Sequence, residues 1–210
     1  MSTEKWAKTM LTKLKEKVQQ LLMLEAGAAH KLGLTPNMIT AIGLVLAFLS
    51  AFAYAEWNFH YTVPWFAFIL LLISGFCDVL DGVVARVYGK ATVFGGFLDS
   101  LLDRYADAVV FVGIAIGGVC DYRAGFLAII GSLLVSYSRA RAEAAGLKME
   151  SVGLAERAER MLILLLTTLI AVYWFPALNI GVIAIAVLAN VTVVQRAVYV
   201  YTKTKKKESV

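Results

Sequence analysis

Four aspartates in the middle of the chain have the spacing of a metal site. Asp78 and Asp81 are three residues apart, and Asp99 and Asp103 are four apart, so each pair lies on one face of a helix. The connection between the pairs is short, so the two faces can meet. Carboxylate oxygens with no histidine nearby are the ligands that Mg²⁺ and Mn²⁺ prefer. The sequence therefore predicts that these aspartates bind Mg²⁺ or Mn²⁺, with coordination positions left for phosphate oxygens.

These acids lie in an apolar part of the chain, where each charge costs roughly 2.5–3.5 kcal/mol at the centre of a membrane helix. The alternative to a metal site is a structural network in which Arg86 and Arg104 neutralise the aspartates. Two arginines cannot balance four carboxylates, which favours the metal site. Gly82, Ala85 and Gly95 stand beside the acids and let the backbone approach a ligand, although close helix packing explains such small residues equally well.

Eight residues of this region form a pattern with fixed spacing. It reads Asp78-x2-Asp81-Gly82-x2-Ala85-Arg86-x8-Gly95-x3-Asp99-x3-Asp103. The pattern resembles the signature of the CDP-alcohol phosphotransferase family at every fixed position. Members of that family are integral membrane enzymes, commonly homodimers, that displace CMP from a CDP-linked lipid with an alcohol.

The resemblance also implies a role for individual residues. Asp78, Asp81 and Asp99 would hold two metal ions, and Asp103 would be the catalytic general base and a further metal ligand. A second set would bind the cytidine and the diphosphate of the CDP-lipid, namely Asn37, Thr40, Gly82, Ala85, Arg86, Thr92 and Gly95. Asp107 lies one helical turn beyond the signature and receives no role.

The acidic residues also suit phosphoryl transfer on chemical grounds. Transfer from a diphosphate needs charge neutralisation more than covalent help, and metal ions supply it. The attacking hydroxyl must lose its proton as the new bond forms, and a carboxylate beside a metal can take that proton. His30 and His60 lie far from the acids in the sequence, so no Ser–His or Cys–His pair offers a competing mechanism.

The composition indicates that membrane helices position these groups. The chain has 210 residues, of which 60% are hydrophobic and 17% are charged. Soluble domains average about 45–50% and about 25%. We therefore predict an all-α integral membrane protein with six transmembrane helices in a domain over residues 35–202. The predicted spans are 37–57, 62–87, 94–118, 121–145, 153–174 and 177–201.

The basic residues indicate which side of the membrane the connections face. Of the 20 lysines and arginines, all but Arg104 and Arg123 fall in segments on one side. Short cytoplasmic loops carry such an excess. We therefore predict a multi-pass protein of the cell membrane with both termini and the active site cytoplasmic. Residues 203–210 are predicted to form a basic cytoplasmic tail near lipid headgroups, with no indication of nucleic-acid binding.

Residues 1–34 are predicted to form an amphipathic helix that precedes the membrane domain. Trp6, Met10, Leu14 and Val18 recur at helical spacing, while the lysines of this segment lie largely on other faces. This pattern is typical of a helix that lies in the membrane interface. A soluble helix that packs on the cytoplasmic loops is the alternative.

A cluster of basic and polar residues near the last three predicted spans indicates the acceptor. The cluster consists of Ser136, Arg139, Arg141, Arg157, Arg160 and Arg196. Arginine binds phosphate through paired N–H donors, so an acceptor that carries a phosphate is favoured. The ordinary excess of basic residues on the cytoplasmic side is the alternative, and it explains less well the arginines placed toward the membrane.

Two further stretches resemble one branch of the family. SYSRARAEAAGL and VGLAERAER are similar to the branch that makes phosphatidylinositol phosphate, or its archaeal ether-lipid counterpart, from inositol 1-phosphate. There Arg157, Arg196 and the basic residue at position 139 would hold the inositol phosphate, and Arg139 stands where the branch has lysine. The resemblance implies CDP-archaeol or CDP-diacylglycerol as the donor, with glycerol 3-phosphate as the alternative acceptor, and a homodimer among membrane lipids.

Two other classes of membrane protein also use intramembrane acids. A divalent-cation transporter commonly shows two related halves, and no second acidic motif follows Asp107. A prenyltransferase would carry two aspartate-rich sites on separate segments, and it would not account for Gly82, Ala85 and Arg86. The sequence therefore favours an enzyme of phospholipid biosynthesis.

Overall fold

The computed structural model describes residues 22–149 and 152–208, and these residues form helices without any strand. A short helical segment covers residues 22–31. The labelled helices are α2 (Pro36–Ala55), α3 (Val63–Val87), α4 (Val93–Ile116), α5 (Tyr122–Ala144), α6 (Arg157–Ala171) and α7 (Pro176–Glu208). The all-α prediction is thus confirmed for the described residues. Most of the predicted amphipathic helix falls in residues 1–21, outside the described part of the chain.

Side-chain caps begin three of the helices, α2, α4 and α5. The Thr35 hydroxyl accepts a hydrogen bond at the start of α2, where Pro36 occupies the first turn. The Thr92 hydroxyl likewise accepts from the Gly95 amide at 2.9 Å and begins α4. Asp121 caps α5 in the same way. Threonine and aspartate are preferred at this position because their oxygens pair amides that the helix leaves unbonded.

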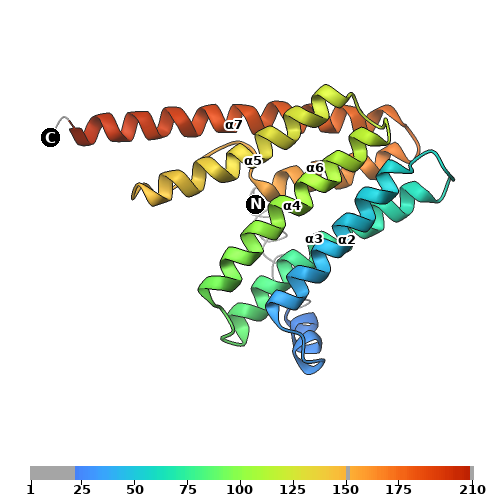
Figure 1. Ribbon diagram of the computed structural model, residues 1–210, viewed down its shortest axis with the longest axis horizontal. Coiled ribbons are helices and arrows are strands. Elements are labelled where there is room, and N and C mark those ends of the chain that lie inside the picture. Colours follow the sequence, from blue (N-terminus) through green and yellow to red (C-terminus); the bar gives the residue numbers. More distant parts are fainter. Residues whose placement is uncertain (1–21, 150–151, 209–210) are drawn as a thin grey trace, which may run out of the picture.

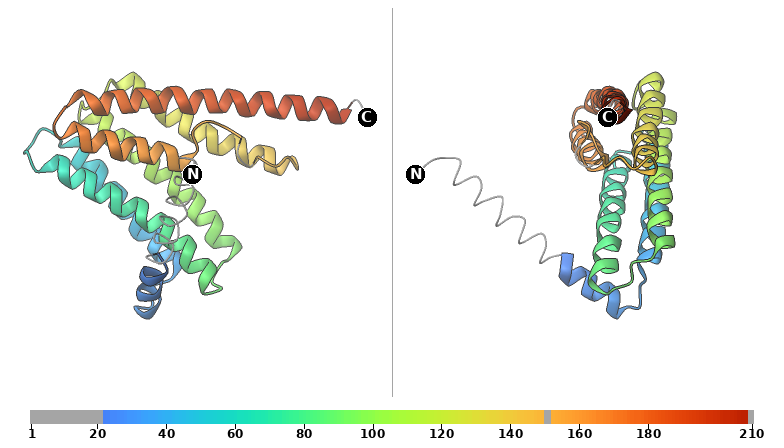
Figure 2. Two further views of the ribbon diagram at one scale, coloured as in Figure 1. Left: turned by 180° about the vertical axis from the view of Figure 1, so that it is seen from behind. Right: turned by 90° about the vertical axis from the view of Figure 1, so that its left-hand side faces the viewer.

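The helices form two groups that diverge toward one end of the molecule. α2 packs against α3 and α4, whereas α5 and α6 pack against α7. Contacts of α4 with α5, and of α3 with α6, join the two groups. Figure 1 shows the connections after α2, α4 and α6 gathered at one end, and the view from behind in Figure 2 agrees. At the other end, α5 and α7 lie away from residues 22–31 and from the connection between α3 and α4 (Figure 1).

Close helix packing holds the first group together. A Cβ atom added to Gly113 or Gly117 of α4 would overlap the backbone oxygens of Ala51 and Tyr54 in α2. Such glycines let two membrane helices approach closely. The Tyr54 and Thr168 hydroxyls lie 2.6 Å apart and link α2 to α6 inside the apolar core. The acids of α3 and α4 are therefore carried by tightly packed helices.

Three of the six predicted membrane spans have the length and apolarity of spanning helices in the structure. They are Pro36–Ala55, Val63–Val87 and Pro176–Lys205. The outer face of α2 exposes Val45, Leu49 and Phe52, as expected for contact with lipid. α4 carries three aspartates and one arginine between Asp99 and Asp107, α5 ends in a charged segment, and α6 has only 15 residues. The protein is thus membrane-embedded, and the count of six spans stays a prediction.

The last two helices differ in extent from their predicted spans. α6 begins at Arg157 rather than near residue 153, because residues 152–156 form an irregular segment that binds α7. α7 continues from Pro176 to Glu208, through the basic segment at the C-terminus. The start of α6 therefore lies where α7 holds the preceding segment.

Candidate active site

α3 and α4 both pack against α2, and this packing brings the predicted acids together. Carboxylate oxygens of Asp78, Asp99 and Asp103 lie within 4.8 Å of one another. Asp81 is 4% exposed and accepts a hydrogen bond of 2.6 Å from the Thr40 hydroxyl of α2. The i,i+3 and i,i+4 spacings place each pair on one helix face, and tertiary packing turns the two faces toward each other.

The donor set fits a hard divalent cation. All the convergent groups are carboxylates, and their oxygens are close enough to repel one another strongly in a partly buried site. Oδ1 of Asp99 is buried and has no hydrogen-bond partner among the described residues. A buried carboxylate oxygen without a partner costs free energy that a bound cation would offset.

Arg157, at the start of α6, reaches into this acidic cluster. Its Nη1 lies 2.6 Å from Asp78 Oδ1 and 3.0 Å from Asp103 Oδ1. Its Nε lies 3.2 Å from Asp107 Oδ1, and Arg160 Nη2 lies 3.3 Å from the other Asp107 oxygen. The sequence assigned Arg157 and Arg160 to the acceptor phosphate, and did not foresee that both contact the acids.

An Asp–Arg network therefore exists, but the alternative drawn from the sequence named the wrong arginines. Arg104 donates to the Ser100 carbonyl of its own helix. Arg86 is exposed, and its guanidinium lies over Gly82, where an added Cβ would come within 3.2 Å of it. The neutralising arginines come from α6, far from the acids in the sequence, so spacing along the chain could not identify them.

A pocket beside the acids gathers the residues predicted to bind the CDP group. It encloses about 580 Å³ and is lined by Asn37, Thr40, Asp81, Gly82, Ala85, Arg86, Thr92, Gly95 and Asp99, among others. A Cβ added at Gly95 would lie 2.9 Å from Thr92 Oγ1 and 3.1 Å from Asn37 Oδ1. The absence of a side chain at Gly95 therefore keeps the pocket open between α2 and α4.

Lys90 also lines this pocket, and the sequence interpretation missed it. Its ammonium lies 3.2 Å from His30 Nδ1, and the His30 ring stacks on Tyr88 with centroids 3.9 Å apart. These contacts tie residues 22–31 to the connection between α3 and α4. The sequence feature that could have indicated this role is the position of Lys90 two residues before Thr92. The interpretation of the sequence used this lysine only to assign the cytoplasmic side.

A wider groove opens on the other side of Asp103. It encloses about 1930 Å³ between α4, α5, α6 and α7. Five of the six predicted acceptor residues line it: Ser136, Arg139, Arg157, Arg160 and Arg196. Arg141 is exposed and does not line the groove. Asp103 also lines the groove, so one carboxylate faces both the acidic cluster and the arginines.

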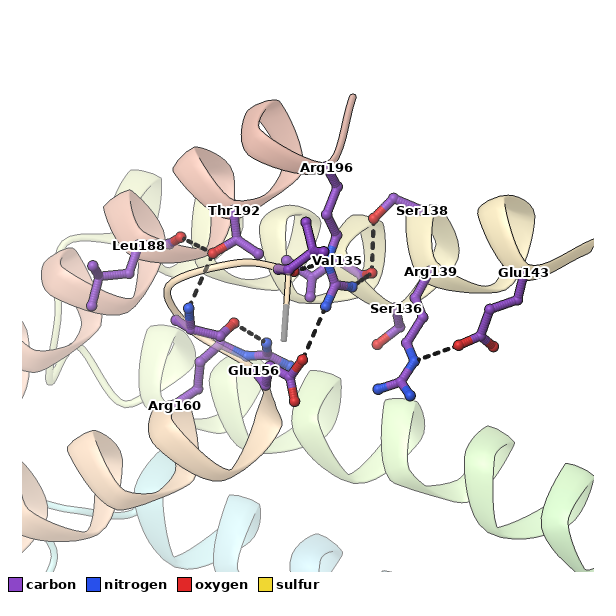
Figure 3. A network of polar contacts seen from close by, with 12 residues as sticks. Val135, Ser136, Ser138, Arg139, Glu143, Glu156, Arg160, Leu188, Thr192 and Arg196 are labelled. Carbon is purple, nitrogen blue, oxygen red and sulfur yellow. Dashed lines mark hydrogen bonds and ion pairs between the residues drawn. The ribbon is translucent and has the colours of Figure 1, made fainter. Parts of the chain in front are cut away.

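Arg196 joins three segments near the wall of this groove, as Figure 3 shows. It is 1% exposed, and its guanidinium donates to the backbone carbonyls of Val152, at 2.8 Å, and Val135. Its Nη2 lies 3.4 Å from Glu156. Thr192, one turn earlier in α7, accepts from the Ala155 amide at 3.1 Å. Arg196 thus holds residues 152–156 against α5 and α7.

Arg139, one turn after Val135 in α5, also lines the groove. Its Nε lies 2.9 Å from Glu143 Oε1, one turn later in α5 (Figure 3). This pair is more exposed than the Arg157 contacts, so it is held less firmly. Among the groove arginines, Arg157 is therefore firmly held beside Asp103, whereas Arg139 lies in a more exposed pair.

Comparison with known proteins identifies relatives along nearly the whole chain. Residues 33–195 match the family model described as CDP-alcohol phosphatidyltransferase. Archaetidylinositol phosphate synthase of Pyrococcus horikoshii is 42% identical over 187 residues, which cover 89% of this chain and 94% of that protein.

Solved structures of one enzyme share the architecture. The crystal structure of phosphatidylinositol phosphate synthase from Mycobacterium tuberculosis with CDP-DAG bound has a TM-score of 0.76 and 30% identity, covering 87% of this chain and 94% of that one. The same enzyme in complex with manganese and citrate also has a TM-score of 0.76 and 30% identity, covering 86% and 89%.

Proposed function

Because this chain belongs to the CDP-alcohol phosphatidyltransferase family, we propose that it transfers the phosphoryl group of a CDP-lipid to inositol 1-phosphate and releases CMP. The observation that carries the proposal is the place of Asp103. This carboxylate belongs to the acidic cluster and also lines the groove that holds the arginines. Such an arrangement suits a base that receives a proton from a phosphorylated acceptor.

Asp78, Asp81, Asp99 and Asp103 would hold two ions of Mg²⁺ or Mn²⁺. When bound, such ions neutralise the diphosphate and the charge that develops on the departing CMP. The manganese in the solved relative supports this assignment, as does the unpaired buried oxygen of Asp99. Thr40 fixes the orientation of Asp81 through its 2.6 Å hydrogen bond.

The pocket between α2, α3 and α4 would receive the cytidine and the diphosphate. Gly82, Ala85 and Gly95 leave room there, while the amide of Asn37 and the hydroxyl of Thr92 offer polar partners at its edge. Arg86 exposes a guanidinium that matches a phosphate. The lipid chains of CDP-archaeol or CDP-diacylglycerol would then lie along the apolar outer faces of the helices. The archaeal relative supports archaeol.

The acceptor would lie in the groove with its phosphate near Arg139 and Arg157 and its hydroxyl toward Asp103. Asp103 would accept the hydroxyl proton as the oxygen attacks the lipid-side phosphorus. The new P–O bond forms as the bond to the CMP oxygen breaks, and CMP carries away that electron pair. Ser136, Arg160 and Arg196 would complete the wall, and Arg141 would add charge outside it.

The arrangement in the membrane is also part of the proposal. The four motif aspartates lie in the halves of α3 and α4 that adjoin the connection with Lys90, which supports an active site facing the cytoplasm with both termini on that side. α4, α5 and α6 would span the membrane with α2, α3 and α7, since α4 packs against α2, and α5 and α6 pack against α7. A homodimer is the proposed assembly.

The test is CMP release by the purified full-length protein. A CDP-lipid and Mg²⁺ or Mn²⁺ would be supplied with inositol 1-phosphate, glycerol 3-phosphate or serine in parallel. We expect release to be fastest with inositol 1-phosphate. Glycerol 3-phosphate is the second candidate, because the groove arginines suit any phosphorylated alcohol. Faster release with glycerol 3-phosphate would overturn the proposed acceptor and leave the family chemistry intact.

A further inference from the structure

We propose that Asp107 is a positioning residue that orients Arg157 between the acidic cluster and the acceptor groove. This inference rests on the proposed function, because it gives Arg157 a place in acceptor binding. Asp107 lies one helical turn after Asp103, outside the eight-residue motif that runs from Asp78 to Asp103. Its side chain nevertheless contacts the arginine that links the two halves of the site.

Asp107 differs from the four aspartates of the motif in what its oxygens bind. The group of carboxylates within 4.8 Å of one another consists of Asp78, Asp99 and Asp103, without Asp107. One Asp107 oxygen lies 3.2 Å from Arg157 Nε, and the other lies 3.3 Å from Arg160 Nη2. Both oxygens are thus used by arginines, so Asp107 acts as an anchor for guanidinium groups.

The anchor is rigid because its surroundings are buried and Arg160 makes a second contact of its own. The side chains of Asp107 and Arg160 are 14% and 4% exposed, and both border an apolar cavity with Val110 and Leu164. Arg160 Nη1 also donates to the Ala155 carbonyl at 3.1 Å. Ion pairs in such low-dielectric surroundings are strong when all of their hydrogen bonds are made, and costly when one partner is lost.

The contact with Asp107 determines which edge of Arg157 remains for a ligand. Nε binds Asp107, and Nη1 binds Asp78 and Asp103, which leaves Nη2 outside these ion pairs. Because the guanidinium is planar, fixing Nε and Nη1 also fixes the direction of Nη2. Arg157 lines the acceptor groove, so this nitrogen is the one available to an acceptor phosphate.

The first measurement compares the two substrates in an Asp107→Asn variant of the full-length protein. We expect the acceptor KM to rise roughly tenfold, as for one lost hydrogen bond to a charged group, with the CDP-lipid KM within about twofold of wild type. If Asp107 served only in folding, the variant would lower the amount of active enzyme and would leave both KM values unchanged. An equal rise in both KM values would overturn the proposal.

The second measurement asks whether Asp107 acts through Arg157. Arg157→Lys keeps a cation but removes Nε, so Asp107→Asn should change the acceptor KM by less than about twofold in that background. In an Arg139→Lys background, which changes an arginine of α5 that also lines the groove, Asp107→Asn should keep its full effect. Equal effects of Asp107→Asn in both backgrounds would overturn the proposal.

Thermal unfolding of every variant checks that it folds. Glu56→Gln, which removes an exposed carboxylate after α2, is the control substitution. If Asp107→Asn does not fold, the same comparisons are made with Asp107→Glu, which keeps the charge and shifts the oxygens. All KM values are measured with whichever phosphorylated acceptor wild type uses fastest. A wild type that prefers glycerol 3-phosphate thus overturns the proposed acceptor, while the two backgrounds still decide the role of Asp107.

Discussion

Arg157 and Asp78 form the shortest ion pair among the described residues, with 2.6 Å between Nη1 and Oδ1. The same nitrogen lies 3.0 Å from Asp103, so one guanidinium contacts two of the three carboxylates that could share a metal ion. An arginine in this place acts as a cation tethered to the protein. It therefore stabilises the acids and also competes with a metal for them.

This relationship predicts that removing Arg157 strengthens metal binding. In Arg157→Gln the carboxylates lose their internal cation, and we expect Mn²⁺ to bind roughly tenfold more tightly, the size of one charged contact. The free Mn²⁺ signal in electron paramagnetic resonance measures the affinity. Arg139→Gln, whose arginine pairs with Glu143 instead, serves as the control and should bind Mn²⁺ as wild type does. Weaker Mn²⁺ binding by Arg157→Gln would contradict competition.

Asp103→Asn is predicted to remove turnover and to keep the CDP-lipid bound. Loss of a positioned general base typically slows reactions by about 10²–10⁴-fold. CMP release would fall accordingly, while CDP-lipid binding, measured by titration calorimetry, would stay close to wild type because the pocket residues are unchanged. Glu56→Gln, which removes an exposed carboxylate just after α2, is the control. CMP release at the wild-type rate from Asp103→Asn would exclude this residue as the base.

Gly95→Ala is predicted to narrow the nucleotide pocket. The added methyl would lie 2.9 Å from the Thr92 hydroxyl and 3.1 Å from Asn37, so these side chains must move. We expect the CDP-lipid KM to rise about tenfold, with the acceptor KM unchanged. Gly96→Ala is the control, because this glycine lines the same pocket and an added Cβ meets nothing within 4 Å. Similar kinetics for the two variants would show that the pocket does not receive the nucleotide.

Arg196→Ala is predicted to lower both stability and acceptor affinity. The variant removes the donor to the Val152 carbonyl, at a cost of about 1–3 kcal/mol if that group stays buried, while the Val135 carbonyl keeps its hydrogen bond from Ser138. Residues 152–156 would loosen and displace Arg157, so the acceptor KM should rise more than the CDP-lipid KM. Thermal unfolding and the two KM values measure these effects. Lys203→Ala, at an exposed position of α7, is the control.

A raised acceptor KM without any loss of thermal stability in Arg196→Ala would change the role of this residue. It would indicate that Arg196 binds the acceptor phosphate directly, as the family resemblance implies. A loss of stability with an unchanged acceptor KM would instead confine Arg196 to holding the segment before α6. The two readouts therefore separate a contact with substrate from support of the fold.

Local spacing was sufficient to predict the helices and the acidic half of the site. Asp78 and Asp81, like Asp99 and Asp103, share a helix face because of the helical repeat, and the apolar runs of α2, α3 and α7 have the length of membrane spans. Gly82, Ala85, Arg86 and Gly95 of the CDP pocket followed from the same motif, because they lie on the helices that carry the acids, whereas Asn37 and Thr40 of α2 were implied by the family resemblance. Lys90 was missed because its role depends on where the connection after α3 turns.

What the sequence by itself determined is therefore the chemistry of α3 and α4: an all-helical chain with converging carboxylates and small residues beside them. Only the tertiary structure decided which arginines meet those acids. Arg157 and Arg160 reach Asp107 because Arg196 and Thr192 hold residues 152–156 on α7, and α6 then packs against α3. Spacing along one helix carries no information about the approach of another. That approach depends on the sum of many packing contacts.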